Sequence, residues 1–329
     1  MTQREADADQ PGELELFLTQ IRYEGRNIHS YEFVDPDGGE LPPFSAGAHI
    51  DIHLAGGLVR QYSLCNSPTE RRRYVIAVLR DAKGRGGSQS LHERLRVQDR
   101  VRVSRPRNNF ELHPAARKTV LLAGGIGITP LKAMAHALRE QGADCELHYC
   151  ARDAGAAAFG GELDALLESG RLHLHFDNGD PARGLDIAGL LHGAPPAGTH
   201  LFYCGPAGFM DACAKAAAHW PAGTVHCEHF KAPERVPDAA APEGGFRIEI
   251  ASTGQCLAVP ADRSIADVLK DAGIGLATSC EAGLCATCKV RYLSGEVDHR
   301  DYVLDAADQQ DYLTVCVSRA RSELLVLDL

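Results

Sequence analysis

The chain has 329 residues, of which 44% are hydrophobic and 24% are charged, a balance typical of a globular protein. Its length predicts two or three domains, and its formal net charge of −10 argues against a nucleic-acid partner. Because no apolar run is long enough to span a membrane and the N-terminus lacks a signal-peptide core, we expect a cytoplasmic protein with no membrane attachment.

Short, alternating segments dominate the chain up to about residue 115. The segments 49–54, 60–64, 74–80 and 100–104 are rich in β-branched residues and are separated by turn residues. Such a series predicts an antiparallel barrel or sandwich. The segment "RQYSL" at 60–64 could bind a phosphorylated aromatic cofactor, with an arginine on the phosphate, or could be an ordinary strand.

From residue 119 the pattern changes to alternating strands and helices. A continuous apolar run, "TVLLAGG", is followed by "ITPLKAMAHALREQG", which places Leu131, Met134, Ala135 and Leu138 on one helical face. Three further apolar strands and two helices follow before the segment 231–245, which is rich in proline and alanine and reads as a flexible joint. The alternation predicts a parallel sheet with helices on both faces.

Two glycine-rich segments in this region follow predicted strands. Both "AGGIGITP" (123–130) and "YCGPAGFM" (203–210) end a strand and begin a helix, where helix N-terminal N–H groups can bind phosphate. Each alone could be only a tight turn. Because ligands bind at the carboxyl edge of open α/β sheets, two such segments in one sheet favour a nucleotide site.

A cysteine-rich loop marks the last region, which begins with a predicted hairpin and a helix capped by Ser264. The sequence "SCEAGLCATC" has the spacing C-x4-C-x2-C, and Cys316 is the one cysteine after it. This is the spacing of a plant-type [2Fe–2S] centre; zinc and unligated thiols are the alternatives. Residues 243–329 hold 14 Asp and Glu against 8 Lys and Arg, which fits an acidic docking surface or merely a solvated domain.

Six motifs in this order resemble the phthalate dioxygenase reductase family, including reductases of the vanillate demethylase type. They are "RQYSLCN", "GRGGS", "AGGIGITP", "FYCGPAGFMD", "HWPAGTVHCEHF" and "SCEAGLCATCKVRYLSGEVDHRDYVL". The resemblance implies a multidomain protein: an FMN-binding antiparallel β-barrel (1–115), an NAD-binding α/β domain with a parallel sheet (116–232), a linker (233–243) and an α+β ferredoxin domain of the plant-type β-grasp fold (244–329).

The resemblance also implies a set of site residues. The FMN contacts would be Arg60, Gln61, Tyr62, Ser63, the backbone of Ala77, Val78 and Leu79, and Arg85, Gly86, Gly87 and Ser88. The nicotinamide nucleotide would lie along Gly125, Gly127, Ile128, Thr129, Cys204, Gly205 and Pro206, and the cluster would be held by Cys280, Cys285, Cys288 and Cys316. Ser63, Cys204 and Phe230 would orient the reacting rings, with Phe230 covering the flavin and Glu228 near it.

The implied function is an oxidoreductase that passes electrons from NADH to FMN, then to the [2Fe–2S] cluster, and then to the terminal Rieske-type oxygenase of an aromatic dioxygenase or O-demethylase. The protein would serve aromatic catabolism as a monomer. NADH is favoured over NADPH because Asp153, beside Arg152, would repel a 2′-phosphate. The alternatives are a reductase for a haem mono-oxygenase or another acceptor, and a non-enzymatic iron–sulfur sensor.

Overall fold

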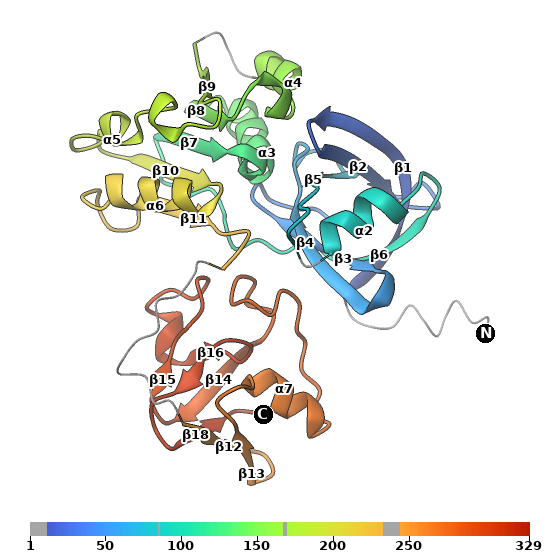
Figure 1. Ribbon diagram of the computed structural model, residues 1–329, viewed down its shortest axis with the longest axis vertical. Coiled ribbons are helices and arrows are strands. Elements are labelled where there is room, and N and C mark those ends of the chain that lie inside the picture. Colours follow the sequence, from blue (N-terminus) through green and yellow to red (C-terminus); the bar gives the residue numbers. More distant parts are fainter. Residues whose placement is uncertain (1–11, 85, 167–169, 233–243) are drawn as a thin grey trace. The chain divides into compact units, whose positions relative to one another are not determined.

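The chain forms two compact units in the computed structural model, Met1–Phe230 and Lys231–Leu329 (Figure 1). The structure describes residues 12–84, 86–166, 170–232 and 244–329, so Arg85 of the "GRGGS" motif and the predicted linker 233–243 lie outside the described residues. Within those ranges, no helix combines the length and the apolar character needed to cross a lipid bilayer.

The first unit begins with a six-stranded antiparallel sheet in the order β4-β3-β6-β1-β2-β5. Its two edge strands meet, because Leu64 and Ile76 form a bridge and the Cys65 N–H donates to the Val75 carbonyl at 2.8 Å. The sheet is therefore closed into the predicted barrel, which is filled by side chains such as Leu16. The strands are β1 (Glu13–Gly25), β2 (Ile28–Val34), β3 (His49–Leu54), β4 (Leu58–Ser63), β5 (Tyr74–Leu79) and β6 (Arg100–Ser104), with helix α2 (Gly87–Arg94) between β5 and β6.

The same unit continues with a five-stranded parallel sheet in the order β11-β10-β7-β8-β9, as the alternating pattern predicted. The strands are β7 (Lys118–Gly124), β8 (Asp144–Ala151), β9 (Leu172–Phe176), β10 (Thr199–Cys204) and β11 (Val225–Glu228). The helices are α3 (Ile128–Glu140), α4 (Gly160–Leu166), α5 (Ile187–Leu190) and α6 (Ala207–Ala216).

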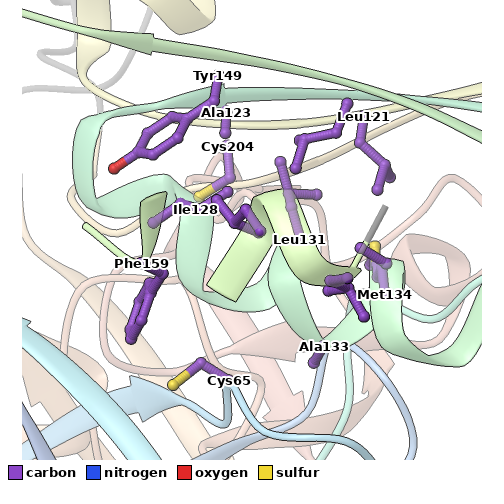
Figure 2. Close-up of a cluster of buried hydrophobic side chains, with 14 of the residues drawn as sticks. Cys65, Leu121, Ala123, Ile128, Leu131, Ala133, Met134, Tyr149, Phe159 and Cys204 are labelled. Carbon is purple, nitrogen blue, oxygen red and sulfur yellow. The ribbon is translucent and has the colours of Figure 1, made fainter. Parts of the chain in front are cut away.

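Both faces of this sheet are covered. The four residues predicted for one face of α3 are all buried, and Figure 2 shows Leu131 and Met134 of that helix in one cluster with Leu121 and Tyr149 of the sheet. On the other face, side chains of β7 and β10 pack against α6, where Met210 and Cys213 are buried. The 3.6-residue period of the helices and the apolar strands together explain this three-layer arrangement.

The second unit has a five-stranded mixed sheet in the order β13-β12-β18-β14-β16, with a small β15–β17 pair. The predicted hairpin is confirmed, since β12 and β13 pair antiparallel, and Ser264 and Asp267 form a capping box at the start of α7. The cysteine loop lies between α7 and β14. The bounds are β12 (Phe246–Ile250), β13 (Gln255–Val259), α7 (Ile265–Asp271), β14 (Lys289–Ser294), β15 (Val297–Asp298), β16 (Tyr312–Thr314), β17 (Arg319–Ala320) and β18 (Leu324–Leu327).

Candidate functional site

A corner suited to an anion forms where β4 passes the start of α2. The stem of Arg60 lies so close to Gly87 that a Cβ there would stand 2.5 Å from the Arg60 Cγ. Gly86, at φ 79°, leads into the helix, and no described side chain caps it. The first N–H groups of α2 and the Arg60 guanidinium thus lie in one place, an arrangement suited to a phosphate.

Two further residues of β4, Gln61 and Tyr62, also carry polar side chains. Burial raises the pKa of Tyr62 above its ordinary value, although Arg60 opposes this shift, so the phenol stays neutral. The Gln61 Nε2 atom lies 3.2 Å from Nε2 of His49 on β3. On β5, Ala77 and Val78 are buried whereas Leu79 is 39% exposed, so the strand end faces solvent.

Ser63, at the end of β4, meets Glu228, at the end of β11. The Ser63 hydroxyl donates to Glu228 Oε2 at 3.4 Å, and His49 Nδ1 lies 4.0 Å from Oε1 of the same carboxylate. Burial raises the pKa of Glu228 to about 8, an effect that the hydrogen bond from Ser63 partly offsets. Burial, with a smaller effect of Arg107, lowers the pKa of His49 to about 4. Near neutral pH the imidazole is neutral and the carboxyl group can hold a proton.

The two glycine-rich segments lie against each other at the ends of β7 and β10. A Cβ at Gly127 would overlap the Cys204 carbonyl, and one at Gly205 would stand 3.0 Å from the Gly124 Cα. Gly125 has φ +53°, a left-handed conformation that favours glycine. The backbones of the two segments therefore approach closely, with the Phe209 side chain packed against Gly124 and Gly205. This mouth opens at the start of α3 and suits a close-fitting pyrophosphate.

Cys204 lies beside Glu228 in the parallel register of β10 and β11. The thiol is fully buried, and burial together with the Glu228 carboxylate raises its pKa well above the ordinary value. Cys204 is therefore a neutral thiol packed in the core beneath the mouth, which does not favour nucleophilic attack, and its contact with the nicotinamide remains a prediction. Phe230 follows β11 by two residues and is 39% exposed.

The cysteine loop turns through three left-handed positions. Glu281, Gly283 and Ala286 have φ values of 49°, 71° and 54°. Two backbone N–H groups, from Ala282 and Leu284, donate to the Cys280 sulfur at 3.4 Å each. Non-glycine residues at positive φ are uncommon, and the N–H groups directed at sulfur are those that stabilise thiolate ligands and tune cluster potentials.

The four cysteines form two pairs. A hydrogen bond with Cys280 lowers the pKa of Cys285 to about 5, and a hydrogen bond with Cys316 lowers that of Cys288. Among the described residues, no three His, Cys, Asp or Glu side chains converge as ligands of a single ion. Two pairs suit two bridged irons better than one tetrahedral zinc. The Ser279 hydroxyl, next to Cys280, is buried and has no hydrogen-bond partner within the described residues, so the site fits a group that accepts hydrogen bonds.

Comparison with known proteins decides the family. Residues 248–321 match the 2Fe-2S iron-sulfur cluster binding domain. The chain is 56% identical over 324 residues to the reductase subunit of the tert-butanol monooxygenase / tert-amyl alcohol desaturase of Aquincola tertiaricarbonis, covering 96% of each. The solved phthalate dioxygenase reductase, described as a modular structure for electron transfer from pyridine nucleotides to [2Fe–2S], is 41% identical with a TM-score of 0.72 and full coverage of both chains. The chain belongs to the phthalate dioxygenase reductase family.

The reductase is thus an oxidoreductase component of an oxygenase system, and the predicted fold class is confirmed. A further solved structure, an intact type IV self-sufficient cytochrome P450 monooxygenase, has a TM-score of 0.87 and 37% identity. That comparison covers 96% of the reductase but only 41% of the P450 protein.

The structure brings most of the predicted site residues together in groups. Arg60 lies with Gly86, Gly87 and Ser88 at the corner suited to an anion. Gly125 and Gly127 follow β7 and meet the end of β10 at the glycine mouth, whereas Ile128 and Thr129 are buried at the start of α3. The roles of all these residues remain predictions. The sequence reasoning missed His49, which reaches Glu228 from β3. Its one signal was its place in the alternating segment 49–54, which does not distinguish it from other strand histidines.

Proposed function

We propose that this reductase transfers electrons from NADH, through FMN and a [2Fe–2S] cluster, to the terminal Rieske-type oxygenase of an aromatic dioxygenase or O-demethylase system. The observation that carries this proposal is the contact of Ser63 with Glu228. It joins the barrel strand that would hold a flavin to the sheet edge that would hold a nucleotide, in a chain whose other unit bears paired thiols.

The residues present fit the three groups. Arg60 and the start of α2 would hold the FMN phosphate, the β4 and β5 strand ends would line the ring, and the paired cysteines would hold the cluster. When bound, FMN accepts a hydride and passes electrons on singly, and the cluster carries one electron at a time. The order from NADH to FMN to the cluster follows from the number of electrons that each of them carries at one time.

The protein's own part is orientation and control of protons. Hydride transfer between two rings needs no protein base, so Ser63 and Cys204 would serve to place the rings. Glu228 would hold a proton within reach of the Ser63 hydroxyl, and the exposed Phe230 ring would cover the flavin. None of these side chains acts as a nucleophile in this scheme.

The proposal includes NADH rather than NADPH. Asp153 follows β8 and accepts two hydrogen bonds from Arg26, at 3.0 and 3.1 Å, and a third from the Ala156 N–H. Arg26 lowers the pKa of this carboxyl, so it stays charged. A carboxylate held in place beside Arg152 would favour the ribose hydroxyl of NADH over the 2′-phosphate of NADPH. We further propose that the reductase works in the cytoplasm as a monomer.

A haem mono-oxygenase is the second candidate acceptor. The observation that favours it is the likeness of nearly the whole chain to part of a cytochrome P450 monooxygenase. The two acceptors are distinguished by mixing the purified reductase with a Rieske-type oxygenase or with a P450 haem domain and following substrate turnover driven by NADH. If turnover were faster with the haem domain, a haem mono-oxygenase would replace the Rieske-type oxygenase as the proposed acceptor.

The proposed function is tested by an anaerobic titration with NADH followed in visible light. We expect flavin and iron–sulfur absorbance as isolated or after reconstitution, bleaching of the flavin by NADH, and then reduction of the cluster. NADPH should be slower by about tenfold or more, which corresponds to ~1.4 kcal/mol of discrimination. Material that takes up neither FMN nor iron, or that NADH does not reduce, would contradict the proposal.

A further inference from the structure

Lys132 is a buried cation inside the first unit. It lies one turn into α3 and is only 5% exposed. Its ammonium donates to the Cys65 carbonyl at 3.1 Å and pairs with Glu162 Oε2 at 2.9 Å. It also lies 4.8 Å from the centroid of the Phe159 ring. Because a buried charge is stable only when it is paired and hydrogen-bonded, these partners must stay in place around it.

The first partner belongs to the barrel. Cys65 follows Ser63 by two residues, is fully buried, and is fixed by its own N–H, which donates to Val75 at 2.8 Å. Figure 2 shows Cys65 on its barrel segment, in the same cluster as Ala133 of α3 and Phe159. The ammonium thus links the helix to the end of the proposed flavin strand.

A second link joins the same segment to the far end of α3. The Ser67 hydroxyl donates to Glu140 Oε1 at 2.7 Å, and the Thr69 hydroxyl donates to the same oxygen at 3.0 Å. Glu140 is the last residue of α3. Segment 65–69 is therefore attached near both ends of the helix, and Lys132 makes the attachment nearer the glycine mouth.

The other partners of Lys132 also reach the barrel. Glu162 of α4 binds Arg22 of β1 as well as the lysine. Phe159, one residue before α4, has φ 63° although it is a buried aromatic residue. A bulky residue in this region is strained and persists only where its surroundings determine it, so the packing around the ammonium is tightly defined.

We propose that Lys132 is a positioning residue for hydride transfer, which holds the flavin strand at a fixed distance from the nucleotide mouth. The inference rests on the proposed function. In that reaction one hydride passes from NADH to the bound flavin and leaves NAD⁺, and Lys132 exchanges neither proton nor electron. The mouth Gly125–Gly127 directly precedes α3, and Ser63 lies two residues before Cys65. A shift of either segment would separate the two rings, and hydride transfer depends steeply on that distance.

The test compares Lys132→Met with Lys118→Met in the full-length holoprotein. Lys118 is a matched control because it also pairs with a glutamate, Glu146, at 2.9 Å, but it starts β7 at the edge opposite the mouth. For Lys132→Met we expect the limiting rate of flavin reduction at saturating NADH to fall by about tenfold or more, with a primary isotope effect from deuterated NADH. The Kd for NADH and the flavin content should change by less than about threefold. Lys118→Met should match the wild type.

Two further measurements do not depend on turnover. Titration with NAD⁺ of the chemically reduced protein should give weaker nicotinamide–flavin charge-transfer absorbance in Lys132→Met. Hydrogen exchange of the apoprotein should show faster exchange in segment 63–67 for Lys132→Met alone. Lys132→Arg, which keeps the charge, should restore part of the charge-transfer absorbance.

If Lys132→Met does not fold, the double variant Lys132→Met/Glu162→Gln takes its place, because it also removes the carboxylate charge that the ammonium had paired. A limiting rate and a charge-transfer band equal to those of the wild type would overturn the inference. Equal losses in the Lys118→Met control would overturn it too. A wild-type protein that NADH does not reduce would instead overturn the proposed function, and with it this inference.

Discussion

The cysteine loop and the glycine mouth are built in opposite ways. The loop takes three of its four sulfurs from nine consecutive residues, and its chemistry lies in side chains. The mouth joins segments far apart in the chain. The Gly127 backbone lies against the Cys204 carbonyl, and the Ser63 side chain meets that of Glu228 across 165 positions. A cluster site is thus encoded by local spacing, whereas the hydride site depends on how two sheets are placed within one unit.

This difference predicts how each site fails. Loss of one sulfur removes a ligand that no neighbour can replace, so the effect should be complete but confined to the cluster. A change in the mouth should leave the ligand-binding groups in place and alter their distances, so the effect should be graded.

The largest expected effect is that of Cys285→Ser. Cys285 is buried and paired with Cys280, so its removal should abolish the cluster and reduce oxygenase-linked turnover to below about 1%. NADH should still reduce the flavin at nearly the wild-type rate. Iron and sulfide content, electron paramagnetic resonance and stopped-flow absorbance measure these quantities.

Cys256→Ser is the matched control, because Cys256 is an exposed cysteine of the same unit, on β13. It should leave iron content and turnover unchanged. If Cys285→Ser lost flavin reduction as well as the cluster, the cysteine loop and the glycine mouth would not fail separately. The contrast drawn between these two sites would then be wrong.

The next effect is that of Gly127→Ala, which tests the backbone-built mouth. The added Cβ would overlap the Cys204 carbonyl, so β10 must move away from the start of α3. We expect kcat/KM for NADH to fall by about a hundredfold, the scale of a misplacement near 1 Å. Cluster content should be unaffected. Stopped-flow flavin reduction over a range of NADH concentrations measures the change.

Gly208→Ala provides the control for Gly127→Ala. Gly208 lies in α6, within the second glycine-rich segment, and nothing lies within 4 Å of an added Cβ. Its conversion to alanine should leave NADH kinetics unchanged and stabilise the helix slightly. If Gly127→Ala and Gly208→Ala had the same NADH kinetics, the close approach of Gly127 to the Cys204 carbonyl would not matter for function.

The same contrast explains what the sequence could predict. The C-x4-C-x2-C spacing, the buried face of α3 and the capping box at Ser264 are local patterns, and the structure contains each of them. They depend on residues close together in the chain, so periodicity and spacing are enough to find them.

Features that depend on long-range pairing were missed. The strands β1 and β2 belong to no motif, and helix α2, which begins at Gly87 inside the "GRGGS" segment, was not predicted. The approach of His49 to Glu228 joins the third strand of the barrel to the last strand of the parallel sheet. Such contacts follow from barrel closure and sheet order, which no single stretch of residues determines.

The last expected effect is on stability and depends on pH, from Glu228→Gln. Glu228 titrates near pH 8 in the folded protein but near its ordinary value of 4.5 when unfolded, because burial disfavours the charge. Between these values the folded state binds more protons, so stability falls as pH rises from about 4.5 to about 8. Glutamine keeps the shape and cannot ionise. We expect Glu228→Gln to be more stable than the wild type by about 4 kcal/mol at pH 8 and equally stable at pH 4.

Thermal unfolding followed by flavin fluorescence reports on the first unit and measures this difference across pH. Glu146→Gln is a control of opposite sign, because a hydrogen bond from Lys118 lowers the pKa of Glu146. This hydrogen bond stabilises the fold above pH 4.5, where Glu146 is ionised, and the stabilisation is lost in acid. Glu146→Gln should therefore be slightly less stable than the wild type near neutral pH. A wild-type protein whose stability does not fall between pH 5 and 8 relative to Glu228→Gln would mean that Glu228 is ionised at neutral pH. The hydride site would then hold a fixed charge rather than a proton, and its contact with Ser63 would serve orientation alone.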